Sequence, residues 1–221
     1  MQSDSIFFGN VLNLIKEGHK WQYTDLSGYG KKPKIYFSYT QIFFFTVSCI
    51  GVYFLSNGFS KDFIGYTMAA LAVFIGLFIS ITLNAFDKFQ NIDFKKILEN
   101  DNEKVLQKLS KNFFRQFTAL TCYGVIIAII CIILLSLSLL CDIFSTDITN
   151  YSFVDSWHSI NIQNFGTFAG LSLLVIYRIL ILYFLLDFIY LVAVSLGKLF
   201  EYISFEFEKA ERIIKQREEC E

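Results

Sequence analysis

The chain has 221 residues, of which 54% are hydrophobic and 26 are Phe, and its mean hydropathy is +0.49. That length suits one soluble domain or a small bundle of membrane helices. The composition favours the bundle, because about 20 apolar residues of helix cross the roughly 30 Å hydrocarbon core of a bilayer. The formal net charge of −1 excludes a partner that is selected by overall charge.

The sequence holds no recognisable catalytic or metal-binding motif. It has no GxSxG, HExxH or Walker loop, and its five cysteines form no CxxC pair or Cys/His spacing. Cys49, Cys122 and Cys131 lie within apolar runs, where we interpret them as small apolar residues. We therefore expect no enzyme activity and no cofactor.

Residues 1–34 are expected to form a cytosolic N-terminal helix and loop. The start of this segment lacks the basic residues and the cleavage site that are typical of a signal peptide. Ser3 or Asp4 can cap a short amphipathic helix instead, which we expect to lie along the membrane surface or against the bundle. Its apolar face consists of Ile6, Phe7, Val11, Leu14 and Ile15.

Four long apolar runs follow this segment. Each of them must be helical in lipid, because no water is present there to satisfy the backbone. The predicted fold is an all-α integral membrane protein in which residues 35–197 form a bundle of four transmembrane helices. The four spans are Ile35–Leu55, Phe63–Phe86, Phe117–Leu140 and Gly166–Leu196.

The basic residues indicate how these spans are oriented. Seventeen of the 19 Lys and Arg residues lie in 1–34, 87–116 and 198–221. The connections after the first and third spans hold only Lys61. The positive-inside rule therefore predicts a multi-pass protein with both termini and residues 87–116 in the cytosol.

Residues 87–116 are predicted to extend the second and third spans as a cytosolic helical hairpin. Its arms would project about 18 Å at 1.5 Å per residue, and Glu99–Asn102 marks its turn. Charges of both signs interleave there, so we expect no direct contact with nucleic acid. Four lysines are candidates for binding a partner protein: Lys95, Lys96, Lys104 and Lys108.

Residues 198–221 are predicted to continue the fourth span as a C-terminal helix. Glu208 with Arg212, and Glu211 with Lys215, form i,i+4 pairs of the favourable order. Three arrangements stay open at this point. The helix is a solvated tail, it packs on the hairpin, or it packs on another subunit.

The fourth span carries two formal charges, Arg178 and Asp187. Nine residues separate them, which places them on opposite faces of a helix and about 13 Å apart along it. One register of the helix puts Asp187 at the cytosolic interface and leaves Arg178 near the midplane. The other puts Arg178 at the outer interface and buries Asp187, and a charge at that depth costs roughly 3 kcal/mol.

Three arrangements would lower this cost. Arg178 and Asp187 extend to opposite interfaces while the bilayer thins locally. Alternatively, neutral side chains of other spans, with Gln41 and Asn84 as candidates, hydrogen-bond the buried charge. In the third arrangement a second subunit supplies the partner or the charges line a shared pore. Small residues spaced like Ala193 and Gly197 are typical of close helix contacts.

This plan resembles the small four-span membrane subunits of bacterial antiviral defence systems, and the membrane subunit of the Kiwa system in particular. The four spans, the cytosolic termini and the charged hairpin around Glu99–Asn102 carry the resemblance. It is a resemblance of topology, so no residue roles are transferred. It implies a homo-oligomeric complex of the inner membrane that senses infection and engages a soluble effector on its cytosolic side.

Two functions are therefore hypotheses. The first is a homo-oligomeric sensor or scaffold whose partners are the lipid bilayer, further copies of the chain and a cytosolic effector protein. The second is an oligomeric ion channel or pore former. An accessory subunit of a transporter is a third possibility, whereas a transporter itself usually needs more spans, broken by Pro or Gly.

Overall fold

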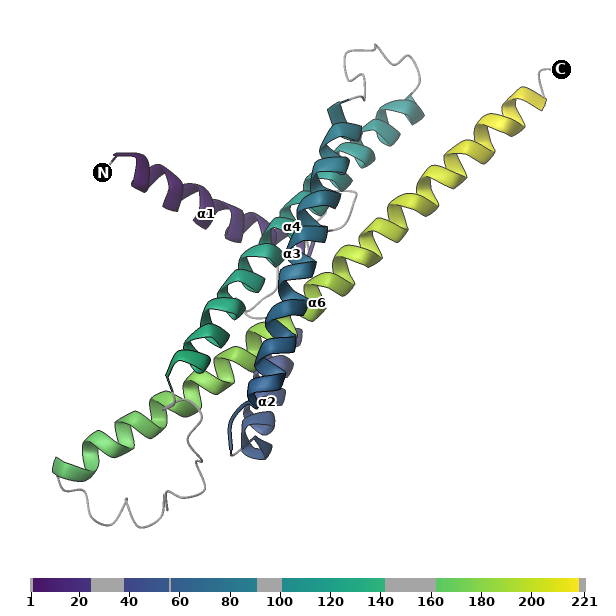
Figure 1. Ribbon diagram of the computed structural model, residues 1–221. Coiled ribbons are helices and arrows are strands. Elements are labelled where there is room, and N and C mark those ends of the chain that lie inside the picture. Colours follow the sequence, from purple (N-terminus) through teal and green to yellow (C-terminus); the bar gives the residue numbers. More distant parts are fainter. Residues whose placement is uncertain (1, 25–37, 56, 91–100, 142–161, 219–221) are drawn as a thin grey trace. The chain divides into compact units, whose positions relative to one another are not determined.

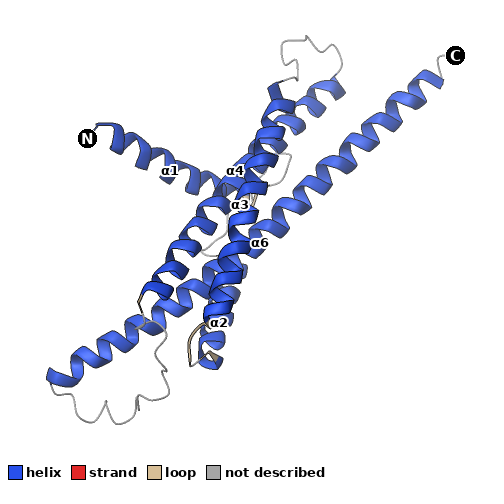
Figure 2. Cartoon of the chain, in the orientation of Figure 1, coloured by secondary structure: helices blue, strands red, loops and turns tan. Residues whose placement is uncertain are grey.

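The computed structural model describes residues 2–24, 38–55, 57–90, 101–141 and 162–218. These residues form helices and turns and no strand, as Figures 1 and 2 show. The prediction of an all-helical protein is confirmed for this part of the chain. The helices are α1 (Gln2–Trp21), α2 (Tyr39–Phe54), α3 (Lys61–Gln90), α4 (Asp101–Leu140) and α6 (Ile162–Glu218).

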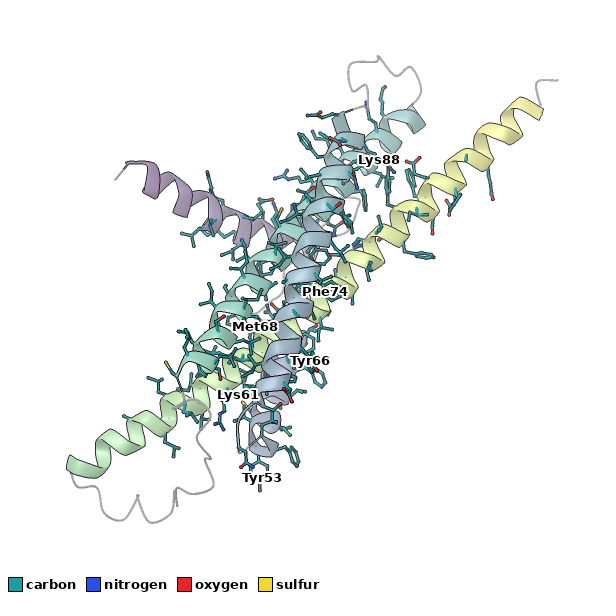
Figure 3. All side chains as sticks on the ribbon, viewed as in Figure 1. Tyr53, Lys61, Tyr66, Met68, Phe74 and Lys88 are labelled. Atoms are coloured by element: carbon teal, nitrogen blue, oxygen red, sulfur yellow. The ribbon has the colours of Figure 1, made fainter. Side chains whose placement is uncertain are left out.

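Three of the described helices, α3, α4 and α6, are long and apolar enough to cross a membrane. α3 has 30 residues and α4 has 40, which correspond to about 45 Å and 60 Å at 1.5 Å per residue. Lys61 and Lys88 lie near the two ends of α3 (Figure 3), and the residues from Phe63 to Phe86 between them carry no formal charge. This uncharged stretch coincides with the predicted second span.

The first predicted span forms a shorter apolar helix. α2 begins at Tyr39 because Ser38 and Gln41 form a capping box, in which Gln41 N donates to Ser38 Oγ at 3.3 Å and Ser38 N donates to Gln41 Oε1 at 3.2 Å. The helix has 16 residues and measures about 24 Å, less than the roughly 30 Å hydrocarbon core. Residues 35–37 of the predicted span lie outside the described residues.

The extensions beyond the predicted spans are helical where they are described. α4 begins at Asp101, well before the apolar run that starts at Phe117. α6 continues without a break from Ile162 to Glu218, so the predicted C-terminal helix and the fourth span are one element. Most of the predicted hairpin turn, with Lys95 and Lys96, lies outside the described residues.

Many large apolar side chains are exposed on the surface of the described helices. Phe43 and Tyr53 on α2 are 62% and 82% exposed, and Tyr66 and Val73 on α3 are similarly open. Tyr53 and Tyr66 are among the side chains labelled in Figure 3. A soluble monomer rarely exposes so much contiguous apolar surface, whereas lipid tails cover it without cost.

The chain divides into two compact units, and α3, α4 and α6 each contribute to both. Unit 2 consists of Pro33–Ile75 and Ile126–Ile189. Within it, α6 contacts each of the other helices. Tyr177 Oη donates to Leu134 O of α4, and Phe188 packs edge to face on Phe74 of α3. A Cβ placed on Gly51 of α2 would lie 3.1 Å from Leu182 Cδ1, so that helix also approaches closely.

Unit 1 consists of Met1–Lys32, Gly76–Val125 and Tyr190–Glu221, and α4 is its central helix. The hydroxyls of Thr82 on α3 and Thr121 on α4 form a hydrogen bond of 3.0 Å. An aromatic cluster on α4 packs against both α3 and α6, and Tyr202 of α6 stacks on Phe113 with ring centroids 4.0 Å apart. The cluster consists of Phe113, Phe114 and Phe117.

α1 packs on α4 at a point where only glycine fits. A Cβ on Gly18 would lie 2.5 Å from Tyr123 Cβ and 3.3 Å from the carbonyl oxygen of Ala119. One of these atoms is a Cβ and the other is a backbone oxygen of a helix, so no side-chain rotation moves either of them away. A Cβ on Gly9 of the same helix would meet no atom within 4 Å.

We predict that Gly18→Ala and Gly9→Ala change stability in opposite directions. Gly9→Ala should stabilise by about 0.5–1 kcal/mol, because alanine is the better helix former. Gly18→Ala should destabilise the docking of α1 by about 1–3 kcal/mol through overpacking. Thermal unfolding in detergent, followed by the emission of Trp21 in a Trp157→Phe background, measures both. Equal effects of the two variants would contradict the close contact at Gly18.

Candidate functional site

Arg178, the cation within the fourth predicted span, is fully buried in unit 2. Its Nη1 donates a hydrogen bond to the carbonyl oxygen of Leu55 at 3.2 Å. Leu55 is the C-cap of α2, and a cation at a helix C-terminus is favourable because the terminal carbonyls carry partial negative charge. The guanidinium of Arg178 is thus enclosed by protein.

This contact bears on the register of α6. Leu55 lies in the connection that leads to Lys61 at the start of α3, so Arg178 lies at the level of a connection between helices. From Arg178 to Lys198 is about 30 Å of helix, which matches the hydrocarbon core. Asp187 then falls near the middle. In the predicted four-span topology, this contact corresponds to the register that places Arg178 at an interface and buries Asp187.

Asp187 is the second charged residue of this span and is only 2% exposed. Its Oδ1 has no hydrogen-bond partner in the part of the chain that the structure describes. Cys131 of α4 lies within electrostatic range of the carboxyl, and the adjacent Phe188 packs on Phe74. A carboxylate that is buried with an oxygen lacking a hydrogen bond is costly.

The other predicted residues of this site lie elsewhere. Gln41 is buried at the first turn of α2, where its side chain completes the capping box, at the opposite end of that helix from Leu55. Asn84 is exposed on α3 in unit 1. Neither residue was expected in these roles. Gln41 holds a helix end because its short distance from Ser38 favours the local hydrogen bonds over a distant charge.

The predicted partner-binding lysines are described only in part. Lys104 and Lys108 are exposed on α4, in the segment ahead of the apolar run. Lys95 and Lys96 lie outside the described residues. Further along α4, the Phe113 cluster contacts Leu199 and Tyr202 of α6. Of the three arrangements left open for the C-terminal helix, these two residues therefore show packing on α4 within the chain.

Gln116 is a structural residue that the sequence reasoning did not single out. It lies on α4 and is fully buried. Its Nε2 donates to the carbonyl oxygen of Trp21, the last residue of α1, at 2.9 Å and to that of Thr24, three residues beyond the helix, at 2.8 Å. The one signal in the sequence is an uncharged polar residue beside a run of aromatic residues, which alone does not indicate a helix-capping role.

A small ionic group surrounds the same junction. Arg115 Nη2 lies 3.1 Å from Glu17 Oε2 and its guanidinium lies 5.6 Å from the centre of the Trp21 ring. Trp21 Nε1 also donates to Glu17 at 3.0 Å. Partial burial by itself would raise the pKa of Glu17. The hydrogen bond from Trp21 and the positive charges of Lys20 and Arg115 outweigh burial, so the pKa lies below its ordinary value of 4.5.

These contacts share one geometry. In each unit, a buried side chain of a long helix donates to the carbonyls at the C-terminal end of a shorter helix, Gln116 to α1 and Arg178 to α2. Such carbonyls have no partner within their own helix and are costly when buried. Among the described residues, no group of three or more His, Cys, Asp or Glu side chains could hold a metal ion.

Comparison of the chain with family models, with curated proteins and with solved structures finds no match.

We predict that the docking of α1 weakens in acid through Glu17. Because the pKa of Glu17 is lowered in the folded protein, its stabilising contribution is fully present above 4.5 and is lost as pH falls through the lower, folded value. A titration of Trp21 emission from pH 7 to pH 3, in the Trp157→Phe background, should show a red shift in acid. Glu17→Gln should remove that component, and an unchanged titration in this variant would refute the role of Glu17.

Proposed function

We propose that this chain is a homo-oligomeric sensor or scaffold of the bacterial inner membrane that engages a cytosolic protein. In this proposal the membrane is crossed four times, by α2, α3, α4 and α6. Both termini and residues 87–116 are cytosolic. The observation that carries the proposal is the segregation of 17 of 19 basic residues into segments that belong, where described, to one folded unit.

Unit 1 supports a role in binding protein. Helix extensions that merely emerged from a membrane would need no fixed partner, yet α1 and α6 are both attached to α4 by specific contacts. Gln116 holds the end of α1, and Tyr202 stacks on Phe113. Exposed lysines, among them Lys104 and Lys108, project from the same unit. A folded surface with defined charges suits recognition of a protein partner better than a solvated tail does.

Antiviral defence is the biological setting that this proposal adopts. It rests on the likeness of the predicted topology to the membrane subunit of the Kiwa system. In that setting the membrane-embedded helices respond to infection, and the charged surface of unit 1, which includes Lys104 and Lys108, holds a soluble effector. The chain itself would carry out no chemical reaction.

The orientation can be tested by labelling single cysteines in a cysteine-free chain. An impermeant maleimide applied to intact spheroplasts should label Lys61→Cys. It should label Lys104→Cys only after lysis, because the positive-inside rule places that residue in the cytosol. Both positions are exposed in the structure, so accessibility within the chain is matched. Labelling of Lys104→Cys in intact spheroplasts would overturn the proposal.

A second candidate function is an oligomeric ion channel or pore former, and Asp187 is the observation that favours it. A buried carboxyl in an apolar span has few structural uses, because replacing it with an apolar residue would remove its cost. Carboxyl groups within membrane helices often mark pathways for ions or protons. In a channel, neighbouring copies would place Asp187 and Arg178 along a shared water-filled path.

Ion flux separates the two functions. For the scaffold we predict that liposomes containing the purified chain release a potassium gradient no faster than liposomes without protein. A channel would release it rapidly, and Asp187→Asn would change the rate several-fold. Ile176→Leu, an exposed apolar position on the same helix, is the matched control and should leave any flux unaltered. Flux that depends on Asp187 would replace the scaffold proposal with the channel.

A further inference from the structure

The C-terminal part of α6 has two different faces. One face packs within unit 1, where Leu191 and Ser195 are buried and Tyr202 stacks on Phe113. Another face is apolar and exposed. Phe200 is 71% exposed and Phe207 is 68% exposed, although charged residues surround both of them in the sequence.

The exposed apolar residues follow a seven-residue repeat, with alternating spacings of three and four. We call this set the α6 seam. Ile189 and Ile214 continue the same spacing in the sequence, so the repeat covers 26 residues. Sustained a/d spacing of this kind is the pattern by which parallel helices pack knobs into holes. The seam consists of Ala193, Leu196, Phe200, Ile203, Phe207 and Ala210, all of them exposed.

Lipid can cover only the first part of the seam. Lys198 lies where the apolar run ends, and beyond it Glu201, Glu208 and Glu211 are exposed on the same helix. Phe200, Ile203 and Phe207 share this charged segment, which belongs in water. An occupant of the whole seam must therefore be apolar both inside the membrane and beyond its surface, in a straight line along a helix.

We infer that the α6 seam packs against the α6 seam of a second copy of this chain. A parallel copy meets the requirement by construction, because its own seam has the same apolar residues at the same depth. The contact is isologous, as expected for a twofold interface whose axis is normal to the membrane. The inference rests on the self-association in the proposed function and specifies the helix face that makes it.

The exposed side chains supply a large part of the area of a stable contact. An aromatic side chain buries about 150–250 Å², so Phe200 and Phe207 of two copies, at their observed exposure, supply about 400–700 Å². Stable interfaces begin at roughly 1,200 Å². Leu196, Ile203 and the flanking Ile189 are also 43–57% exposed and add to this area in both copies.

Small residues allow the membrane part of the seam to come close to its copy. Ala193 lies on the seam, and Gly197 lies beside it with open space around the position of a Cβ. Helices in lipid associate through close packing of such small residues, since there is no hydrophobic driving force between them. The same seam therefore uses small residues within the membrane and large aromatic residues beyond it.

Oxidative cross-linking tests the inference. In a cysteine-free chain in native membranes, Ile203→Cys and Ala210→Cys should give disulfide-linked dimers with copper phenanthroline. Glu201→Cys and Glu208→Cys are equally exposed on the same helix but lie off the seam, and should give at least about tenfold less. The contrast follows because a disulfide needs Cα atoms within about 7 Å. Equal yields from the two pairs would overturn the inference.

Two further measurements separate this inference from the self-association beneath it. The mass of the wild-type chain in detergent should be that of an oligomer, and Phe200→Glu with Phe207→Glu should reduce it to a monomer. Gly65→Cys tests whether copies associate through α3 instead of through the seam. An oligomer that cross-links through Gly65→Cys and not through the seam would overturn the seam and leave the proposed function standing. A monomeric wild-type chain would overturn both.

Discussion

The absence of water from the hydrocarbon core is the constraint on which this structure depends. Every backbone amide and carbonyl in lipid has to be satisfied inside the protein, so the chain forms long helices with few interruptions. α3, α4 and α6 satisfy this requirement along their length. The backbone groups at their termini and at the ends of shorter helices lack such partners, and specific side chains hydrogen-bond some of them. Gln116 and Arg178 are both buried, and both donate to carbonyls at the C-terminal end of a shorter helix.

Arg178 and Asp187, the two charged residues of the fourth predicted span, differ in their contacts. Arg178 has a contact that accounts for its position, although Leu55 O also accepts from Gly58 N at 3.0 Å and would keep a partner without it. Asp187 has a buried oxygen without a described partner. A carboxyl retained at such a position contributes little to the stability of one chain. It is therefore the residue within the membrane that most needs an explanation in function or in assembly.

The proposals place two activities on different faces of the same unit. The aromatic cluster on α4 fixes α6 by one face, through Leu199 and Tyr202, and leaves the seam on another. Self-association through the seam would bring the charged surfaces of several copies together on the cytosolic side of the membrane. A soluble partner would then meet several binding surfaces at once, and avidity would raise its affinity without any new contact.

The sequence by itself determined the helical class, the positions of the long apolar helices and the uneven distribution of basic residues. These follow from composition and run length, which do not depend on neighbours. Only the tertiary structure decided that Gly18 rather than Gly9 is in close contact and that Gln116 holds α1. It also decided which face of α6 packs and which stays open. The physical reason is that lipid-facing and protein-facing positions of a membrane helix are both apolar. The periodicity that marks the buried face of a helix in water is therefore weak in these spans.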